Sequence, residues 1–371
     1  MKLSKRKTVF VALSGGVDSA VSALLLKKQG FNVVGVYMKN WSGDDYGLQD
    51  DCPYKQDLKD VEKIAKNLNI PYRVYNFEKE YYQKVIEYFF SEYSKGRTPN
   101  PDVMCNKEIK FSLFLDKALE DGADFIATGH YVRKESKEIN DKIVFNLLKG
   151  VDENKDQSYF LYLITQNQLK KSFFPIGNLT KRKVRNIAKD NNISVADKPD
   201  SQGICFVGEI NVQDFLRQKI KSHLGDIIDI ETGEKKGVHD GVEFFTIGQR
   251  EGLKIGGAKE PYYVVKKDYQ KNILYVAMGR NNKYLFNNKV FLEDFHLIRD
   301  DLDTNYILNS SNLKASIRYR HNPEKVKLSK FKDKLLAEFE KPQRAVTPGQ
   351  SLVVYEGDVC LGGGVICDIN F

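Results

Sequence analysis

A short run of small and polar residues near the N-terminus has the composition of an anion-binding turn. The letters SGGVDS cover residues 14–19 and directly follow the apolar run Thr8–Leu13. Two adjacent glycines let a backbone turn tightly and approach a ligand. A helical pattern begins at Ser19, and the N–H groups and positive dipole end of a helix start attract anions. The pattern predicts a phosphate-binding loop, against the simpler interpretation of a capped strand-to-helix turn.

A cysteine that could take part in catalysis lies near the end of a loop that contains two prolines. Gly96–Lys107 contains two prolines, which favour an ordered extended loop over a helix. We expect the next helix to begin at Lys107, so Cys105 lies where that helix starts. A helix N-terminus and a nearby lysine both lower a thiol pKa. Asp102, three residues earlier, could transfer a proton.

A second cysteine, Cys205, lies in another loop that contains proline and glycine, Asp197–Phe206. It is 100 positions from Cys105, so only the fold can bring the two thiols together. Cys52 lies in a polar segment and receives no role. Cys360 and Cys367 lie in glycine-rich, strand-like surroundings, for which a structural role is the better interpretation.

Composition excludes several classes of protein. The 371 residues contain 58 Lys and Arg against 50 Asp and Glu, and 41% are hydrophobic, which excludes wholesale disorder. Five cysteines without a C-x-x-C pair argue against a disulfide scaffold and a four-thiolate zinc site. No apolar stretch approaches the ~20 residues of a membrane helix. We expect a cytoplasmic protein with reduced thiols and no membrane association.

Strand and helix patterns alternate along the first half of the chain, which predicts a doubly wound parallel α/β sheet. In such sheets ligands bind beyond the carboxyl ends of the strands, here the loops after Leu13, Met38 and Thr128. After about Gly208 short strand-like runs dominate and predict two β-rich pieces. These runs include Asp226–Ile230, Val242–Ile247, Tyr262–Lys266 and Ser351–Tyr355. The expected domains are 1–207, 208–279 and 280–371.

Positive charge is concentrated in one stretch. Residues 157–189 contain no acidic residue and seven basic ones: Lys170, Lys171, Lys181, Arg182, Lys183, Arg185 and Lys189. Such a run is usually a solvated helix face. Its length favours a footprint for nucleic-acid phosphates, so alanine at 181, 182, 183 and 185 should weaken nucleic-acid binding and lower its salt dependence.

Longer motifs connect these features to a known family. The loop itself resembles the pyrophosphate loop of the ATP pyrophosphatase superfamily. The strings are SGGVDS at 14–19, GRTPNPDVMCNKEIKF at 96–111, ATGHYVR at 127–133, DENKDQSYFLY at 152–162, DSQGICFVGE at 200–209, TIGQREGLKIGG at 246–257, and VTPGQ with VCLGGGVI within 346–366. Together they resemble the bacterial tRNA-specific 2-thiouridylases, in colinear order over essentially the whole chain.

The resemblance implies a Rossmann-like domain of the adenine nucleotide alpha hydrolase type, a central β-rich domain and a C-terminal β-barrel. It also implies a reaction in which ATP, with Mg²⁺, adenylates O2 of the anticodon wobble uridine before sulfur replaces that oxygen. Cys205 matches the cysteine that carries a persulfide. Cys105 matches the partner that attacks it and leaves a Cys105–Cys205 disulfide, and Asp102 matches the acid or base.

The resemblance implies further site residues and partners. Positions that match nucleotide contacts are Ala12, Leu13, Ser14, Gly15, Gly16, Val17, Asp18, Ser19, Met38 and Gly129. Positions that match contacts to the target base or the rest of the tRNA are Asn100, Pro101, Asp102, His130, Lys155, Asp156, Gln157, Arg318, Tyr319 and Gln350. The expected partners are tRNAs of the Lys, Glu and Gln type and a cysteine desulfurase or sulfur-relay protein, with the chain acting as a monomer.

Three alternatives stay open at the level of sequence. An amide-forming synthetase or a lysidine-type ligase would share the loop but would not need Cys105 and Cys205. A non-catalytic tRNA-binding or sulfur-carrier protein is disfavoured by the intact loop. An iron–sulfur cluster held by Asp102, Cys105 and Cys205 is conceivable, though it is not the favoured route.

Overall fold

The N-terminal part of the chain is built on a parallel sheet. The computed structural model describes residues 6–42, 54–200, 203 and 211–368, so Cys52 and Cys205 lie outside the described residues. Five strands pair in the order β3-β2-β1-β4-β7, all parallel. They are β1 (Thr8–Ala12), β2 (Asn32–Lys39), β3 (Tyr72–Asn76), β4 (Phe125–Ala127) and β7 (Ser172–Phe173). The doubly wound α/β prediction is confirmed.

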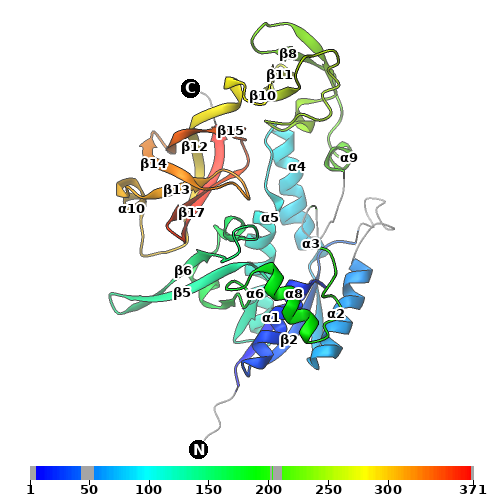
Figure 1. Ribbon diagram of the computed structural model, residues 1–371, viewed down its shortest axis with the longest axis vertical. Coiled ribbons are helices and arrows are strands. Elements are labelled where there is room, and N and C mark those ends of the chain that lie inside the picture. The colour runs from blue at the N-terminus through cyan, green and yellow to red at the C-terminus, as the bar shows by residue number, and fades with distance from the viewer. Residues whose placement is uncertain (1–5, 43–53, 201–202, 204–210, 369–371) are drawn as a thin grey trace, which may run out of the picture.

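Helices cover both faces of this sheet because β1 is apolar on both sides (Figure 1). Val9 and Val11 pack with α1 and α8, whereas Phe10 and Ala12 belong to the core on the other face. The helices are α1 (Val17–Lys28), α2 (Tyr54–Leu68), α3 (Glu78–Tyr81), η2 (Tyr82–Ile86), α4 (Glu87–Ser94), α5 (Pro101–Met104), η3 (Cys105–Leu113), α6 (Phe114–Glu120), η4 (Ser158–Leu161), α7 (Gln166–Lys170) and α8 (Lys181–Asp190).

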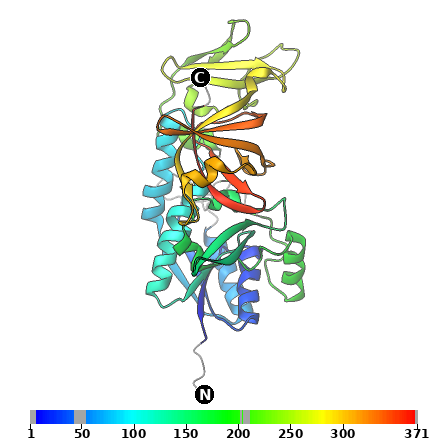
Figure 2. The ribbon, with the colours of Figure 1, turned by 90° about the vertical axis from the view of Figure 1, so that its left-hand side faces the viewer.

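A small mixed sheet forms the central domain, and α4 extends from the N-terminal domain to it (Figures 1 and 2). Its strands pair in the order β10-β11-β8-β9. Phe89 and Phe90 of α4 pack their rings against Phe215 of the helix that precedes these strands. The elements are α9 (Val212–Arg217), β8 (Gly225–Asp229), β9 (Lys235–His239), η5 (Val242–Phe244), β10 (Tyr262–Asp268) and β11 (Ile273–Met278).

The C-terminal domain is a closed six-stranded β-barrel. The strands pair in the order β12-β15-β14-β13-β16-β17, and β17 pairs back with β12. Closure leaves no free edge between these strands. The elements are η6 (Lys283–Leu285), β12 (Phe286–Leu297), α10 (Thr304–Asn309), β13 (Leu313–Ser316), β14 (Glu324–Phe331), β15 (Lys334–Arg344), β16 (Ser351–Glu356) and β17 (Val359–Asp368).

A hairpin from the N-terminal domain joins this barrel. Strands β5 (Val132–Ile139) and β6 (Lys142–Lys149) pair with each other, and β6 pairs with β17 through Leu147 opposite Cys360. The N-terminal domain and the C-terminal barrel therefore share hydrogen-bonded backbone. No helix in the described part of the chain is long and apolar enough to cross a membrane.

Two local expectations are wrong. The helix that carries Cys105 begins at Pro101 rather than Lys107, because Pro101 occupies the first helical position, where its missing N–H costs nothing. Asn100 caps this helix by accepting a hydrogen bond from the Val103 N–H at 3.3 Å. The apolar run Val242–Ile247 is a 3₁₀ turn (η5) followed by irregular chain rather than a strand, although its side chains are buried as a strand's would be.

Candidate active site

The SGGVDS loop forms a tight turn between β1 and α1. Gly15 has φ of +74°, and a Cβ there would lie 2.8 Å from the Asp57 carbonyl oxygen. The Ser19 hydroxyl accepts a hydrogen bond from the Ser14 N–H and donates one to the Gly16 carbonyl, which fixes the turn. Gly16 precedes the first residue of α1, so the N–H groups of the first helical turn have no partner within the helix. This geometry suits an anion.

The residues expected at the nucleotide converge at one sheet edge. Ala12 ends β1, and Val36 on β2 is its register partner, which places Met38 beyond it at the carboxyl edge. Gly129 follows β4, and a Cβ on it would lie 2.9 Å from the Ser19 nitrogen. Leu13, Ser14, Gly15, Gly16, Val17, Asp18 and Ser19 form the turn between them. The sheet thus brings the ten positions to its carboxyl end, where ligands bind in open α/β folds.

A network of charged side chains surrounds Asp18. Both carboxylate oxygens of Asp18 accept hydrogen bonds from Lys181 Nζ, at 2.7 and 2.8 Å. The Tyr131 hydroxyl donates to the same carboxylate at 2.7 Å. Lys181 Nζ also lies 2.6 Å from Asp200 Oδ1, which pairs in turn with Lys155 and Arg185. Burial alone would raise the Asp200 pKa, but the bonds from Lys155 and Lys181 outweigh it and hold that pKa at about 2.

This network gives several of the basic residues in the expected phosphate footprint acidic partners elsewhere in the chain. Lys181 and Arg185 pair with Asp200, and Lys189 pairs with Asp197. Arg182 and Lys183, by contrast, are exposed on α8. The linear sequence could not reveal this division because the Lys181–Asp18 contact spans 163 positions.

Lys198 connects the base of the second cysteine loop to the phosphate loop. Its Nζ donates to Asp57 at 2.7 Å, to Asp60 at 2.8 Å and to the Gly15 carbonyl at 3.3 Å. Burial lowers the Lys198 pKa, but the bonds to the two carboxylates reverse that effect and raise it. The chain therefore enters the Cys205 segment from a point fixed beside the turn, although Cys205 itself lies outside the described residues.

Cys105 is fully buried near the start of its helix. It belongs to the hydrophobic core that also contains Met38, an expected nucleotide position, and Val103 and Ile109 of its own helix. Asp102 and Cys105 are three positions apart in helical chain, which places them on one face. Cys105 is the fifth residue of the helix that begins at Pro101, so it lies beyond the first turn, where the field of a helix N-terminus is strongest.

The barrel holds the loop before this helix. Gln350 Nε2 donates to the carbonyls of Thr98 and Pro99, at 2.9 and 3.0 Å. The Thr98 N–H donates to the Pro348 carbonyl at 2.9 Å. Arg97 forms ion pairs with the buried Glu92 of α4 and with Glu293 of β12. The position of the Asp102–Cys105 helix therefore depends on a domain that begins 180 residues later in the chain.

Arg97→Ala should destabilise this arrangement. Glu92 is 3% exposed, and without Arg97 its carboxylate keeps only the exposed Lys95 as an ionic partner among the described residues. Removing one partner of a buried ion pair costs about 3 kcal/mol or more in unfolding free energy. Urea denaturation measures the loss. Lys325→Ala, which breaks an exposed pair with Glu340, should cost less than about 1 kcal/mol. Equal effects from the two variants would contradict the assignment.

The other positions expected at tRNA have structural partners. His130 is 7% exposed, contacts Thr128 Oγ1 at 2.8 Å, and burial holds its pKa well below its ordinary value. The Asp156 carboxylate accepts from the backbone N–H groups of Gly150 and Ser158. Gln157 Oε1 accepts from the Tyr131 N–H at 3.0 Å. Each side chain shapes the surface, and none is a freely exposed contact.

Arg318 and Tyr319 lie in the turn after β13. The Tyr319 ring packs on Phe160 of η4, with centroids 4.4 Å apart, and the Arg320 guanidinium lies 5.2 Å from the Tyr319 ring. Arg318 is half-buried, and burial lowers its pKa. This turn therefore joins the barrel to the segment that contains Lys155, and it combines positive charge with an aromatic ring.

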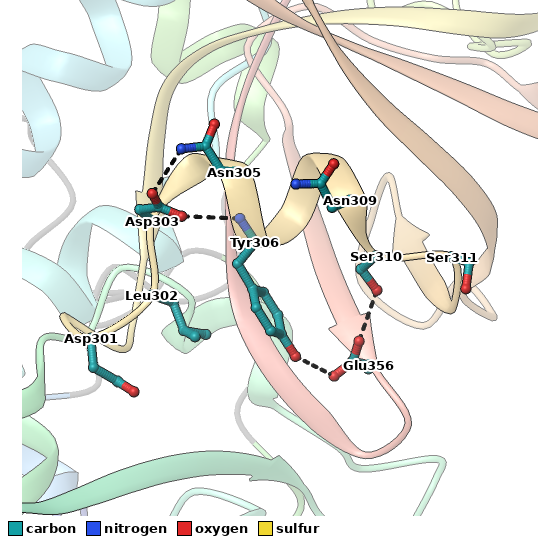
Figure 3. A pocket seen from close by; sticks show the side chains of 9 residues that line it. All are labelled: Asp301, Leu302, Asp303, Asn305, Tyr306, Asn309, Ser310, Ser311 and Glu356. Atoms are coloured by element: carbon teal, nitrogen blue, oxygen red, sulfur yellow. Dashed lines mark hydrogen bonds between the residues drawn. The ribbon is translucent and has the colours of Figure 1, made fainter. Parts of the chain in front are cut away.

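A hollow of about 620 Å³ lies on the barrel beside α10, away from the phosphate loop (Figure 3). The Glu356 carboxylate accepts hydrogen bonds from the hydroxyls of Tyr306 and Ser310, at 2.7 and 2.8 Å. Asp303 caps the helix by accepting from the Tyr306 N–H at 3.0 Å. Asp303 and Glu356 hold α10, and Asp301 pairs with Arg299. The negative charge of these lining carboxylates disfavours phosphates.

Comparison with known proteins identifies the family. Residues 7–209 match the family described as "tRNA methyl transferase HUP domain", residues 213–278 the "tRNA methyl transferase PRC-barrel domain", and residues 287–366 the "Aminomethyltransferase beta-barrel domain". Among solved structures, the NMN synthetase from Francisella tularensis aligns over 53% of this chain and 67% of its own, with a TM-score of 0.33 and 18% identity, a likeness too slight to carry an argument.

Full-length relatives are much closer. The chain is 47% identical to the tRNA-specific 2-thiouridylase MnmA of Oceanobacillus iheyensis, over 99% of this chain and 96% of that protein. It is 48% identical to the protein of the same name from Bacillus subtilis, over 97% of this chain and 95% of that protein. Identity at this level over nearly the whole length shows that the chain belongs to the tRNA-specific 2-thiouridylase family.

Proposed function

We propose that the chain is an ATP-dependent tRNA-uridine 2-sulfurtransferase that converts the anticodon wobble uridine to 2-thiouridine. The observation that carries this proposal is the shared site. An anion-binding turn lies at the carboxyl edge of the sheet, and Cys105 belongs to the same continuous hydrophobic core as Met38 at that edge. The full-length relatives, which are named 2-thiouridylases, supply the reaction.

The first step is adenylation of the uridine O2. The backbone N–H groups at the start of α1 and the exposed Ser14 hydroxyl suit the phosphates of ATP, since both donate hydrogen bonds. Cleavage between the α and β phosphates then makes the substrate oxygen part of an AMP ester, with pyrophosphate as leaving group. Mg²⁺ would neutralise phosphate charge. Asp18 is the acidic side chain of the loop, and phosphate oxygens are among the ligands that Mg²⁺ prefers.

The second step is sulfur transfer. The terminal sulfur of a Cys205 persulfide attacks C2, and AMP leaves with the original oxygen. The Cys105 thiolate then attacks the Cys205 sulfur, and the bond to the transferred sulfur breaks, which releases 2-thiouridine. The transferred sulfur is reduced and the two thiols are oxidised to a disulfide, so an external thiol reductant must restore them. Asp102, one turn from Cys105, is placed to exchange protons with the uracil or the thiol.

The substrate class is tRNA of the Lys, Glu and Gln type, with a cysteine desulfurase or sulfur-relay protein as donor, and the chain acts as a cytoplasmic monomer. The helix starts with its cap Asn100, then Pro101 and Asp102, and this start lies beside the reacting base. His130, Lys155, Asp156, Gln157, Arg318, Tyr319 and Gln350 shape and charge the tRNA surface. The direct test incubates the chain with ATP, Mg²⁺, a persulfide donor and unmodified tRNA, and measures 2-thiouridine by mass spectrometry. Absence of the product would overturn the proposal.

The exposed bases of α8 supply part of the tRNA affinity. Arg182→Ala together with Lys183→Ala should weaken tRNA binding, because each removes a cation that releases a counterion from the RNA backbone. The slope of log affinity against log salt concentration should fall by about one for each residue. Filter binding between low and moderate salt measures it. The double variant Lys325→Ala and Lys327→Ala, on the barrel, serves as a charge-matched control, and an unchanged slope for the α8 variant would refute the assignment.

A further inference from the structure

We propose that Lys181 is a phosphate-binding residue of the nucleotide site and that it exchanges carboxylate partners for oxygens of the pyrophosphate half of ATP. The inference deepens the proposed function and rests on it, because it requires the SGGVDS loop to bind ATP. The acid-free run that contains Lys181 suggested tRNA instead, so the reassignment depends on the fold.

The position of Lys181 is the first reason. Lys181 is the first residue of α8, and its side chain is 13% exposed. Its Nζ lies within 2.8 Å of both oxygens of Asp18, the second residue of α1. The ammonium is therefore at the N-terminal end of α1, beside the turn that is built for an anion. Arg182 and Lys183, the next residues on α8, are exposed instead.

The connectivity of the network is the second reason, because Lys181 can leave without depriving either carboxylate of all its partners. Asp200 keeps Lys155 and Arg185 as ionic partners. Asp18 keeps the hydrogen bond from the Tyr131 hydroxyl. The three N–H donors of an ammonium are all used by Asp18 and Asp200, so each bond to a phosphate oxygen replaces a bond to a carboxylate. This exchange needs only rotation about side-chain bonds.

The test separates phosphate binding from a structural role. Lys181→Met keeps the length and the apolar stem of the side chain and removes its charge. Calorimetry on the full chain compares ATP with Mg²⁺, AMP, and tRNA for the parent and this variant. We expect the dissociation constant for ATP to rise by about tenfold or more, as loss of a charge-assisted contact does. The constants for AMP and tRNA should change less than about twofold, since neither ligand carries the pyrophosphate group. Lys66→Met makes the same chemical change at an exposed lysine of α2 outside the site and should leave ATP affinity unchanged.

Each other outcome has a distinct meaning. If the parent chain binds no ATP, the proposed function fails. If the parent binds ATP and Lys181→Met binds it equally well, the function stands and the inference about Lys181 is overturned. Lys181→Met could instead lose ATP and AMP affinity to the same degree and melt at a lower temperature. The lysine would then have only a structural role, in holding α8 against α1, and the inference would also be overturned.

Discussion

Cys105→Ser is expected to abolish formation of 2-thiouridine while ATP is still consumed. A serine hydroxyl cannot displace the sulfur bound to Cys205 or form a disulfide, so the reaction should stop after the persulfide has attacked the uridine. Loss of an essential nucleophile costs at least about a thousandfold in turnover. The tRNA should then accumulate as a covalent adduct that added thiol releases. Cys205→Ser should stop the reaction earlier, because the persulfide cannot form and no adduct appears. Denaturing gels with labelled tRNA and mass spectrometry of the nucleosides distinguish the two variants.

Cys367→Ser is the control, because Cys367 is half-buried in β17 of the barrel and lies outside the core that surrounds Cys105. It should retain the activity of the parent chain. If 2-thiouridine still forms in both Cys105→Ser and Cys205→Ser, the result contradicts the persulfide mechanism. Iron that copurifies under anaerobic conditions with a visible absorption band would favour the cluster route through Asp102, Cys105 and Cys205 instead.

The pattern of residues around Cys105 predicted the right kind of place but the wrong start of the helix. Two prolines suggested extended chain up to Lys107, yet proline is well tolerated at the first helical position, and Asn100 supplies the cap. The difference matters for chemistry. In a helix Asp102 and Cys105 share a face, whereas in extended chain their separation of three residues would point the side chains apart.

The alternation of strands and helices predicted the parallel sheet, because local periodicity reports which faces are buried. Contacts between segments far apart in the chain have no such local pattern in the sequence. Three such contacts join residues more than 160 positions apart. They are the pairing of β6 with β17, the hydrogen bonds from Gln350 to Thr98 and Pro99, and the Lys181–Asp18 bond. The strand predicted at Val242–Ile247 is wrong for a related reason. An apolar run indicates burial and does not distinguish a strand from a buried turn.

Gly129→Ala is expected to reduce ATP affinity and thiolation strongly, with little change elsewhere. A Cβ at this position would lie 2.9 Å from the Ser19 nitrogen, 3.0 Å from the Asp18 carbonyl carbon and 3.2 Å from the Asp18 Cβ. The first two are backbone atoms of the first turn of α1, so the turn itself must shift. A displacement of about 1 Å at a reacting group can cost a hundredfold in rate. Calorimetry with ATP and the thiolation assay measure the two losses.

Gly256→Ala is the matched control, because a Cβ there meets nothing within 4 Å and its backbone needs no positive φ. The comparison isolates the steric effect of one methyl group, since both variants make the same chemical change. An unchanged melting temperature together with lost ATP affinity in Gly129→Ala would place the damage at the phosphate turn. If Gly129→Ala binds ATP as tightly as Gly256→Ala, the close approach of β4 to α1 does not shape the nucleotide site, and the site must be sought away from this sheet edge.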